Sequence, residues 1–336
     1  MNIHEIVQTQ IAPALGLSAN DLTLTPRRAL EFQSNNLYDL RAGDLHFIVK
    51  EYLKASELES APLHEYQALQ LLSPLDVAPQ PVFFDPTVGP VVVYEYLPGK
   101  MWDRSPPADL SKMIEIWLRI QDLPADWPSH GSDRPLNEVE DGIRQEVDAY
   151  HDWAARAYPP GERAAEICLD LLDKHHAAFE ECALLPVTPC FCRSDPRFAN
   201  VIQRPDGRLG LVDWEDSGLR DPAREVADLI THPNQEDLLC WEDWQRAIDP
   251  YCRAHSQQDP WFTHRLRLYM AIFPLWWLSI ILHRGLSLGE KPPGWSVNGL
   301  PVNERLRHYL ARAVSWPEMN FASCLDKLIN LHFFPA

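Results

Sequence analysis

Three polar residues with the right chemistry for phosphoryl transfer lie within one short stretch, "CRSDPRFANVIQRPDGRLGLVDWED" at residues 192–216. Asn200 follows Asp195 by five positions, and Asp213 ends the next apolar run. The Pro-Asp-Gly sequence at 205–207 is typical of a turn, so the apolar runs on either side should pair as a hairpin. Asn200 and Asp213 are then expected near the same end of the hairpin, with Asp195 in the loop that leads into it.

The types of these residues suggest what they could do. The side-chain oxygens of Asn200 and Asp213 are hard ligands that can hold Mg²⁺ against nucleotide phosphates. A separate carboxylate, that of Asp195, can orient and deprotonate an attacking hydroxyl. An Asp, four residues, an Asn and a later strand-borne Asp is the pattern of kinase catalytic loops. The alternative is a polar hairpin whose side chains only cap turns, because short motifs also arise by chance.

Two features nearer the N-terminus favour the first interpretation. The stretch "FIVKEY" places Lys50 on the third predicted strand, and "LHEYQAL" places Glu65 on the helix that follows. Kinase-type sites need such a strand lysine for the nucleotide phosphates, paired with a helix glutamate. The stretch "VVVYEYLPG" then falls where backbone groups of Glu95, Tyr96 and Leu97 could bind adenine. A lone strand lysine is usually only an exposed side chain, but this order of parts is that of a kinase.

The elements that must position these residues divide the chain into two regions. Residues 1–96 predict a helix, then a small antiparallel sheet with one helix inserted after its third strand; "NLYDLR" and "LHFIVKEYL" form a hairpin around "AGD". Residues 97–336 are mostly helical, interrupted by the hairpin around residues 205–207. We therefore expect an α+β fold with a β-rich N-terminal lobe for the nucleotide and a helical C-terminal lobe for the substrate. A cleft between two lobes is a usual ligand site.

The bulk composition excludes several classes of protein. Among 336 residues, 48 are Asp or Glu and 30 are Lys or Arg, a formal charge of −18 that argues against a nucleic-acid partner. The N-terminus lacks the pattern of a signal peptide. The longest apolar run, Leu268 to Leu282, is short for a membrane span and predicts a buried core helix. Seven irregularly spaced cysteines without a CxxC pair favour a reducing cytoplasm over a disulfide framework or a zinc site.

From about residue 28 to about residue 316 the chain resembles the aminoglycoside phosphotransferase and choline kinase-like family, a branch of the protein-kinase-like fold. The stretch "CRSDPRFANVIQRPDGRLGLVDWEDSGLRDPAREVADL" is similar to the family pattern H-G-D-x-x-x-x-N, a variable turn, a strand ending in D-W/F-E/G, and G-x-x-D-P-A. The resemblance implies transfer of the γ-phosphoryl group of ATP or GTP to the hydroxyl of a small molecule. It also implies roles for individual residues: Asp195 as catalytic base, Asn200 and Asp213 as Mg²⁺ ligands, Lys50 and Glu65 as the phosphate-binding pair, and Asp221 and Glu225 as support for the loop.

The chain departs from the family pattern in two places. Arg193 and Ser194 stand where the family has His-Gly. The family histidine mainly organises the loop, and an arginine could instead pair with an acidic neighbour or a substrate anion, or be a tolerated surface change. A G-x-G-x-x-G loop is also absent, so we expect Ser34, Asn35 and Asn36 to offer donors to the phosphates. The first departure is the reason to retain a second hypothesis, a nucleotide-binding pseudokinase or regulatory module.

Two further groups of residues leave alternatives open. Glu215 and Asp216 follow Asp213 directly, and they either help with a second metal ion or are simply exposed to solvent. The late helical region is rich in aromatic residues, and aromatic faces can hold a cationic amine. This slightly favours an amino-alcohol or aminosugar substrate, while an uncharged sugar, a homoserine-like compound or a macrolide remains open. Core packing is the other interpretation, and the preferred one for two adjacent tryptophans of the group, which comprises Trp241, Trp244, Trp261, Phe262, Phe273, Trp276, Trp277 and Trp295.

Overall fold

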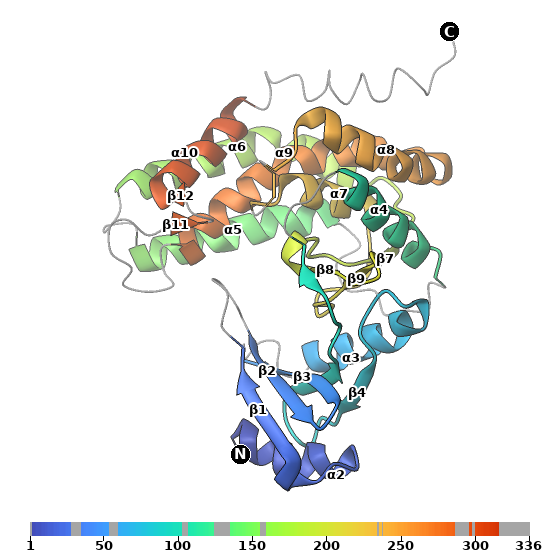
Figure 1. The fold of residues 1–336 in the computed structure, drawn as a ribbon. Coiled ribbons are helices and arrows are strands. Elements are labelled where there is room, and N and C mark those ends of the chain that lie inside the picture. Colours follow the sequence, from blue (N-terminus) through green and yellow to red (C-terminus); the bar gives the residue numbers. More distant parts are fainter. Residues whose placement is uncertain are drawn as a thin grey trace. The chain divides into compact units, whose positions relative to one another are not determined.

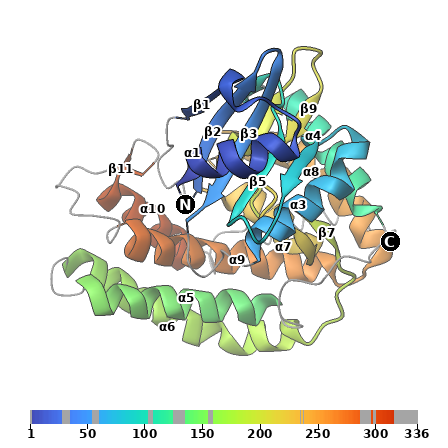
Figure 2. The same cartoon turned by 90° about the horizontal axis from the view of Figure 1, so that it is seen from below.

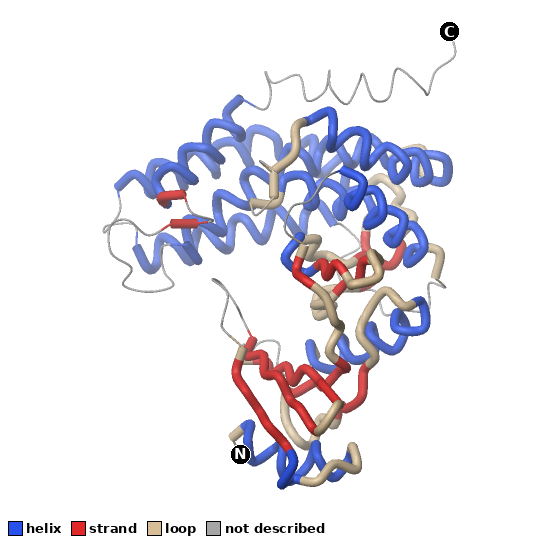
Figure 3. The backbone as a smooth tube through the Cα atoms, in the orientation of Figure 1, coloured by secondary structure: helices blue, strands red, loops and turns tan. Residues whose placement is uncertain are grey.

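The computed structural model divides the chain into two compact units (Figure 1). Unit 1 comprises Met1–Ser105 and Phe198–Ser217, and unit 2 comprises Pro106–Arg197 and Gly218–Ala336. Within them, the structure describes residues 2–27, 35–53, 60–102, 107–123, 135–154, 159–233, 235–236, 238–285, 296–297 and 300–315. Strands predominate in unit 1 and helices in unit 2 (Figure 3), so the chain has the predicted α+β composition.

Unit 1 is built on a five-stranded antiparallel sheet with the order β1-β2-β3-β5-β4. In the predicted hairpin of β2 and β3, Ala42 pairs with Leu45, so Gly43 and Asp44 form the turn. Gly43 adopts a φ of +58°, which a glycine tolerates without strain. The strands are β1 (Leu22–Pro26), β2 (Asn35–Ala42), β3 (Leu45–Tyr52), β4 (Pro81–Phe84) and β5 (Val91–Glu95).

Strand β3 presents different side chains to the two faces of this sheet. Phe47 and Val49 point to one face, where they pack with an N-terminal helical segment that supplies Ile3 and Ile11. This segment consists of α1 (Ile3–Ile6), a π-helical turn (Val7–Ile11) and α2 (Ala12–Ala14). Lys50 points to the opposite face, toward helix α3 (Ala61–Leu72), which contacts β4 and β5. The inserted helix predicted from the sequence therefore lies on the same face as the lysine.

A second sheet completes unit 1, with the order β6-β8-β9. Strands β8 (Val201–Gln203) and β9 (Leu209–Leu211) form the predicted hairpin, and Gly207 takes a φ of +80° in its turn. Strand β6 (Lys100–Met101) pairs with β8, which requires a close approach: a Cβ on Gly99 would lie 2.4 Å from the carbonyl oxygen of Gln203. Residues 97–102 and 198–217, expected with the helical region, thus pack with unit 1. As functional lobes, 1–96 and 97–336 stay a prediction.

Unit 2 is organised around helix α9 (Phe262–Ile280), which contacts α5, α6, α7, α8 and α10. In Figure 2, α5, α6, α9 and α10 run alongside one another. The stretch Phe262–His283 is the one described helix long and apolar enough to cross a membrane by length and composition, and 67% of its apolar window is buried among these neighbours. The prediction of a core helix is confirmed. The other helices are α4 (Pro107–Gln121), α5 (Pro135–Ala154), α6 (Pro159–Ala183), α7 (Pro222–Thr231), α8 (Trp241–Gln258) and α10 (Val302–Ser315).

Two short strand pairs also belong to unit 2. Strand β7 (Cys190–Cys192) pairs with β10 (Gly218–Arg220), so β7 ends where the loop that carries Asp195 begins, and β10 leads directly into α7. The other pair is β11 (Ser296–Val297) with β12 (Leu300–Pro301). The pairing of β7 with β10 fixes the start of the loop that carries Asp195 beside the N-terminus of α7.

Candidate active site

The predicted lysine and glutamate of unit 1 form a buried ion pair. The Nζ of Lys50 lies 2.6 Å from Oε2 of Glu65, with side-chain exposures of 4% and 1%. Tyr52 donates its hydroxyl to the same carboxylate oxygen. Burial alone would lower the pKa of Lys50, but the charges of Asp213 and Glu65 raise it well above its ordinary value. Lys50 is therefore a fixed cation on the face of the sheet that α3 covers.

Asn200 and Asp213 come together in unit 1 as the hairpin predicted. The Nδ2 of Asn200 donates to Oδ2 of Asp213 at 3.3 Å, and the amide of Val212 donates to the carbonyl of Asn200. The other oxygen of Asp213 lies 2.6 Å from Nζ of Lys50. Asp213 adopts a φ of +69°, a left-handed conformation that costs free energy for a residue with a Cβ. The backbone is held in this form at the point where the carboxylate meets the lysine.

Glu215 is a member of the same cluster, which the sequence left undecided. Its Oε2 lies 2.9 Å from Nζ of Lys50, and its side chain is 11% exposed. Burial and the charges of Asp213 and Glu65 raise the pKa of Glu215 to about 7, against the lowering effect of Lys50. Asp216, by contrast, is exposed. One lysine thus faces three carboxylates, and the oxygens of Glu65, Asp213 and Glu215 lie within 4.8 Å of one another, close enough to hold a metal ion.

The two described asparagines of the expected phosphate-covering loop have carboxylate partners. Asn35 is buried and donates its side-chain amide to Glu215 at 2.7 Å. Asn36 donates to Glu51 at 2.9 Å. Ser34 lies outside the described residues. A role for these residues at the phosphates stays a prediction, and the structure adds that Asn35 fixes the position of Glu215.

The expected adenine-binding segment follows β5. The amide of Glu95 donates to the carbonyl of Gln80 at 2.8 Å, and the amide of Tyr96 donates to the carbonyl of His46 at 2.9 Å. The amide of Leu97 makes no hydrogen bond to a described residue. Within this segment, the N–H of Leu97 is therefore the one we expect to reach a nucleotide base.

The predicted base, Asp195, lies in unit 2, where Arg197 is close to one of its carboxylate oxygens and His232 is close to the other. Arg197 donates its Nε to Oδ2 of Asp195 at 2.8 Å. The Nε2 of His232 lies 3.8 Å from Oδ1. Burial and the charge of Arg197 hold the pKa of His232 well below its ordinary value, so the imidazole is neutral. Neither Arg197 nor His232 was predicted as a site residue.

The departure from the family pattern has a structural explanation. Arg193 is buried; its amide donates to Oε1 of Glu225 at 2.6 Å and its Nε donates to the carbonyl oxygen of Asp195 at 2.9 Å. Arg193 thus fixes the loop from within. Ser194 takes a φ of +67°, a conformation that favours the glycine of the family pattern. Glu225 supports the loop as predicted, whereas Asp221 caps α7 through the amide of Ala223 and binds Arg265 at 2.7 Å.

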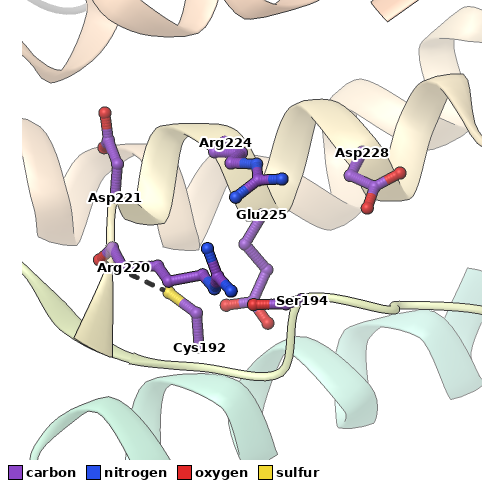
Figure 4. Close-up of a pocket in the computed structure, with 7 residues that line it drawn as sticks. All are labelled: Cys192, Ser194, Arg220, Asp221, Arg224, Glu225 and Asp228. Atoms are coloured by element: carbon purple, nitrogen blue, oxygen red, sulfur yellow. Dashed lines mark hydrogen bonds between the residues drawn. The ribbon is translucent and has the colours of Figure 1, made fainter. Parts of the chain in front are cut away.

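A small pocket of unit 2 lies against this loop, and Figure 4 shows its lining residues drawn from β7, the loop, β10 and α7. The Oγ of Ser194 and Oδ1 of Asp228 are buried there without a hydrogen-bond partner in the described part of the chain. Burial and the charge of Asp195 raise the pKa of Asp228 well above its ordinary value. The lining comprises Cys192, Ser194, Arg220, Asp221, Arg224, Glu225 and Asp228.

Comparison with known proteins accounts for this arrangement. The sequence model described as "Phosphotransferase enzyme family" matches residues 27–269, more than half of the chain. The chain belongs to this family. It is therefore a phosphotransferase, and the prediction of an enzyme is confirmed.

Solved structures show the fold of this phosphotransferase. Choline kinase LicA from Streptococcus pneumoniae is 18% identical, with 92% of this chain and 99% of that chain covered at a TM-score of 0.61. A choline/ethanolamine kinase family protein from Mesorhizobium loti is 18% identical, with 92% of each chain covered and a TM-score of 0.62. Aminoglycoside phosphotransferase APH(2'')-Ib, solved with ADP, is 12% identical, with 94% of this chain and 99% of that chain covered at a TM-score of 0.57. The protein-kinase-like fold is thus confirmed. The comparison with curated proteins gave no match.

Three of the eight aromatic residues of the late helical region lie in the core. Trp244, Phe262 and Phe273 are buried, as the core-packing interpretation predicts. Trp276 packs against Gly142, where a Cβ would lie 2.5 Å from the indole ring. Trp277 is half-buried, with its ring centroid 4.6 Å from that of His232. Trp241 is also half-buried, Trp261 is 44% exposed, and Trp295 lies outside the described residues.

Proposed function

We propose that this phosphotransferase is a small-molecule kinase that transfers the γ-phosphoryl group of ATP or GTP to a substrate hydroxyl. The observation that carries the proposal is the buried cluster of Lys50 with Glu65, Asp213 and Glu215. A buried cation held by surplus carboxylates is an arrangement that a metal ion can complete, because the ion brings the positive charge that the cluster lacks. The lysine and the ion together would then offer two cations to the phosphates of the nucleotide.

Mg²⁺ is the cofactor proposed for this cluster. The carboxylates of Asp213 and Glu215 and the amide oxygen of Asn200 are the hard donors that Mg²⁺ prefers, and Asp213 and Glu215 lie close enough to share an ion. The ion would supply positive charge to the phosphate oxygens. Lys50, held by Glu65, would bind the same phosphates, and Asp213 would contact both the lysine and the metal ion.

Asp195 is proposed as the group that orients the acceptor hydroxyl and takes its proton. Arg197 donates its Nε to Oδ2 at 2.8 Å, which holds the carboxylate in one orientation. The backbone on which Asp195 sits is fixed by Arg193 and Glu225, which limits the range of positions that the carboxylate can adopt. A base held in position lowers the barrier because the entropy of orientation is lost before the reaction begins.

The acceptor class is proposed from three observations. The solved structures with the same fold include choline, ethanolamine and aminoglycoside kinases, all of which act on compounds that carry amines. The formal charge of −18 favours the approach of a cation. Half-buried Trp277 beside His232 offers an aromatic face near Asp195. We therefore propose an amino alcohol or an aminosugar as the acceptor. A cytoplasmic location is proposed separately, from the cysteine pattern alone.

A thermal-shift titration with ATP, GTP and ADP, each with and without Mg²⁺, tests the nucleotide site. The expected result is a rise in Tm with ATP or GTP that requires Mg²⁺. The preferred nucleotide is then assayed with choline, ethanolamine and kanamycin against glucose, homoserine and erythromycin, with Asp195→Asn as the inactive control. Nucleotide binding without transfer to any acceptor would favour the pseudokinase hypothesis, and no binding at millimolar nucleotide would refute the kinase proposal.

A further inference from the structure

The described residues of segment 232–236, which follows α7, contact both the catalytic loop and α10. We call His232, Pro233, Gln235 and Glu236 the brace. We propose that Gln235 is a positioning residue for the reaction, and that the brace transmits the position of α10 to the loop that carries Asp195. This inference rests on the proposed function of Asp195, but the contacts that carry it are all within unit 2.

At the loop end, Gln235 makes two buried hydrogen bonds. Its Nε2 donates to the carbonyl of Pro196 at 3.0 Å and to the carbonyl of Leu229, on the last turn of α7, at 2.8 Å. The residue is 1% exposed. Both protons of one amide group are thus used to tie the loop to the helix.

Pro196 directly follows Asp195, so the hydrogen bond from Gln235 to its carbonyl restrains the backbone next to the proposed base. Proline has no N–H, so a hydrogen bond to its backbone can be made only through the carbonyl oxygen. The carbonyl one position earlier, that of Asp195, accepts from Arg193. Gln235 therefore supplies the next fixed point along the loop after the one supplied by Arg193. His232 of the brace contributes a third constraint, because its ring lies 3.8 Å from the carboxylate of Asp195.

At the other end, Glu236 binds α10. Its Oε1 accepts from Nη1 of Arg305 at 3.0 Å and from the hydroxyl of Tyr309 at 2.5 Å. Arg305 also donates to the carbonyl of Pro233 at 3.2 Å. Glu236, Arg305 and Tyr309 are all buried, and a buried ion pair of this kind is costly to break because one charge is left without compensation. The brace is therefore anchored on α10 more firmly than a surface loop would be.

The consequence concerns the rate of the reaction and not the affinity for nucleotide. Displacing a positioned base by about 1 Å can cost on the order of 100-fold in rate. The residues proposed to bind nucleotide and metal belong to unit 1, and the brace belongs to unit 2. Loss of a brace contact should thus lower kcat while leaving the KM for the Mg²⁺ complex of ATP unchanged.

Gln235→Met tests the two hydrogen bonds of Gln235, since methionine keeps the length of the side chain and removes both donors. Hydrogen exchange of the ligand-free protein should show faster exchange, by about 10-fold, in peptides that cover residues 193–197, and unchanged exchange in residues 201–214. In turnover of MgATP, with the best acceptor or with water, kcat should fall about 10- to 100-fold and KM should change less than about 2-fold. Gln257→Met, at an exposed position of α8, is the matched control.

Tyr309→Phe tests the brace from α10 with a smaller change, in case Gln235→Met does not fold. It should lower kcat in the same direction, and it should have little further effect in the double variant with Gln235→Met, because both act through one element. Unchanged exchange in the loop, or kcat losses that simply multiply in the double variant, would overturn the proposal. The exchange measurement does not require enzymatic activity. It therefore shows whether the brace restrains the loop even if the kinase proposal fails.

Discussion

Glu215→Gln should stabilise the protein at alkaline pH. Lys50 is matched by Glu65 and Asp213 before Glu215 is counted, so the third carboxylate is a surplus charge in a buried site. Its pKa is raised from 4.5 to about 7. A carboxyl with a raised pKa in the folded state binds its proton more tightly there than in the unfolded chain. Folding stability contributed by this group is therefore full below pH 4.5 and is lost as the pH rises toward 7.

The magnitude follows from the same values. The pKa differs by about 2.5 between the folded and unfolded states, and one pKa unit corresponds to about 1.4 kcal/mol. Above pH 7, ionised Glu215 should therefore lower the free energy of unfolding by about 3 kcal/mol. Glutamine keeps the contacts with Lys50 and Asn35 but does not ionise. The free energy of unfolding of the variant, minus that of the wild type, should thus increase by about 3 kcal/mol between pH 4.5 and pH 8.

Urea denaturation at intervals from pH 4.5 to pH 8.5 measures this difference. Glu95→Gln, which removes an exposed carboxylate from the same unit, is the matched control and should show no comparable trend. A constant difference between Glu215→Gln and the wild type across this range would refute the reasoning, because it would mean that Glu215 is ionised in the folded protein throughout.

Three further changes test the site. Asp195→Asn should lower kcat by orders of magnitude and leave the nucleotide-induced rise in Tm intact; near-normal turnover would remove Asp195 as base. Asp213→Ala should weaken nucleotide binding only when Mg²⁺ is present, as measured by calorimetry with and without the ion, and equal weakening in both conditions would contradict a metal role. Ser194→Gly should raise stability by about 1 kcal/mol, since a φ of +67° suits glycine, while kcat is retained; a lower Tm would show that the hydroxyl of Ser194 contributes more than the strain costs.

The parts of the site that the sequence predicted are those fixed by local patterns. The turn at Gly207 joins two apolar strands, so Asn200 and Asp213 had to meet. The pairing of Lys50 with Glu65 followed from the order of a strand and a helix. These relations depend on periodicity and turn chemistry, which a single sequence carries.

The parts that were missed depend on burial and on contacts distant in sequence. Glu215 could not be told from an exposed acid, because the sequence does not show which side chains share a buried site. Strand β6 is two residues long and has no periodicity of its own. One signal was present: Glu225 and Asp228 lie three positions apart on α7, and His232 follows four positions later as its C-terminal cap.

The pairing of β6 with β8 also bears on when the cluster around Lys50, the proposed nucleotide site, can form during synthesis. Lys50 and Asp213 are separated by 163 positions, and residues 106–197 between them belong to the other unit. On the ribosome, unit 1 cannot close until residue 217 has emerged, by which time much of unit 2 has already been synthesised. Until then Lys50 has Glu65 but not Asp213, and the edge of β6 lacks its partner strand, which makes the nascent chain prone to wrong pairings. An N-terminal fragment that ends after β6 would retain this incomplete state permanently.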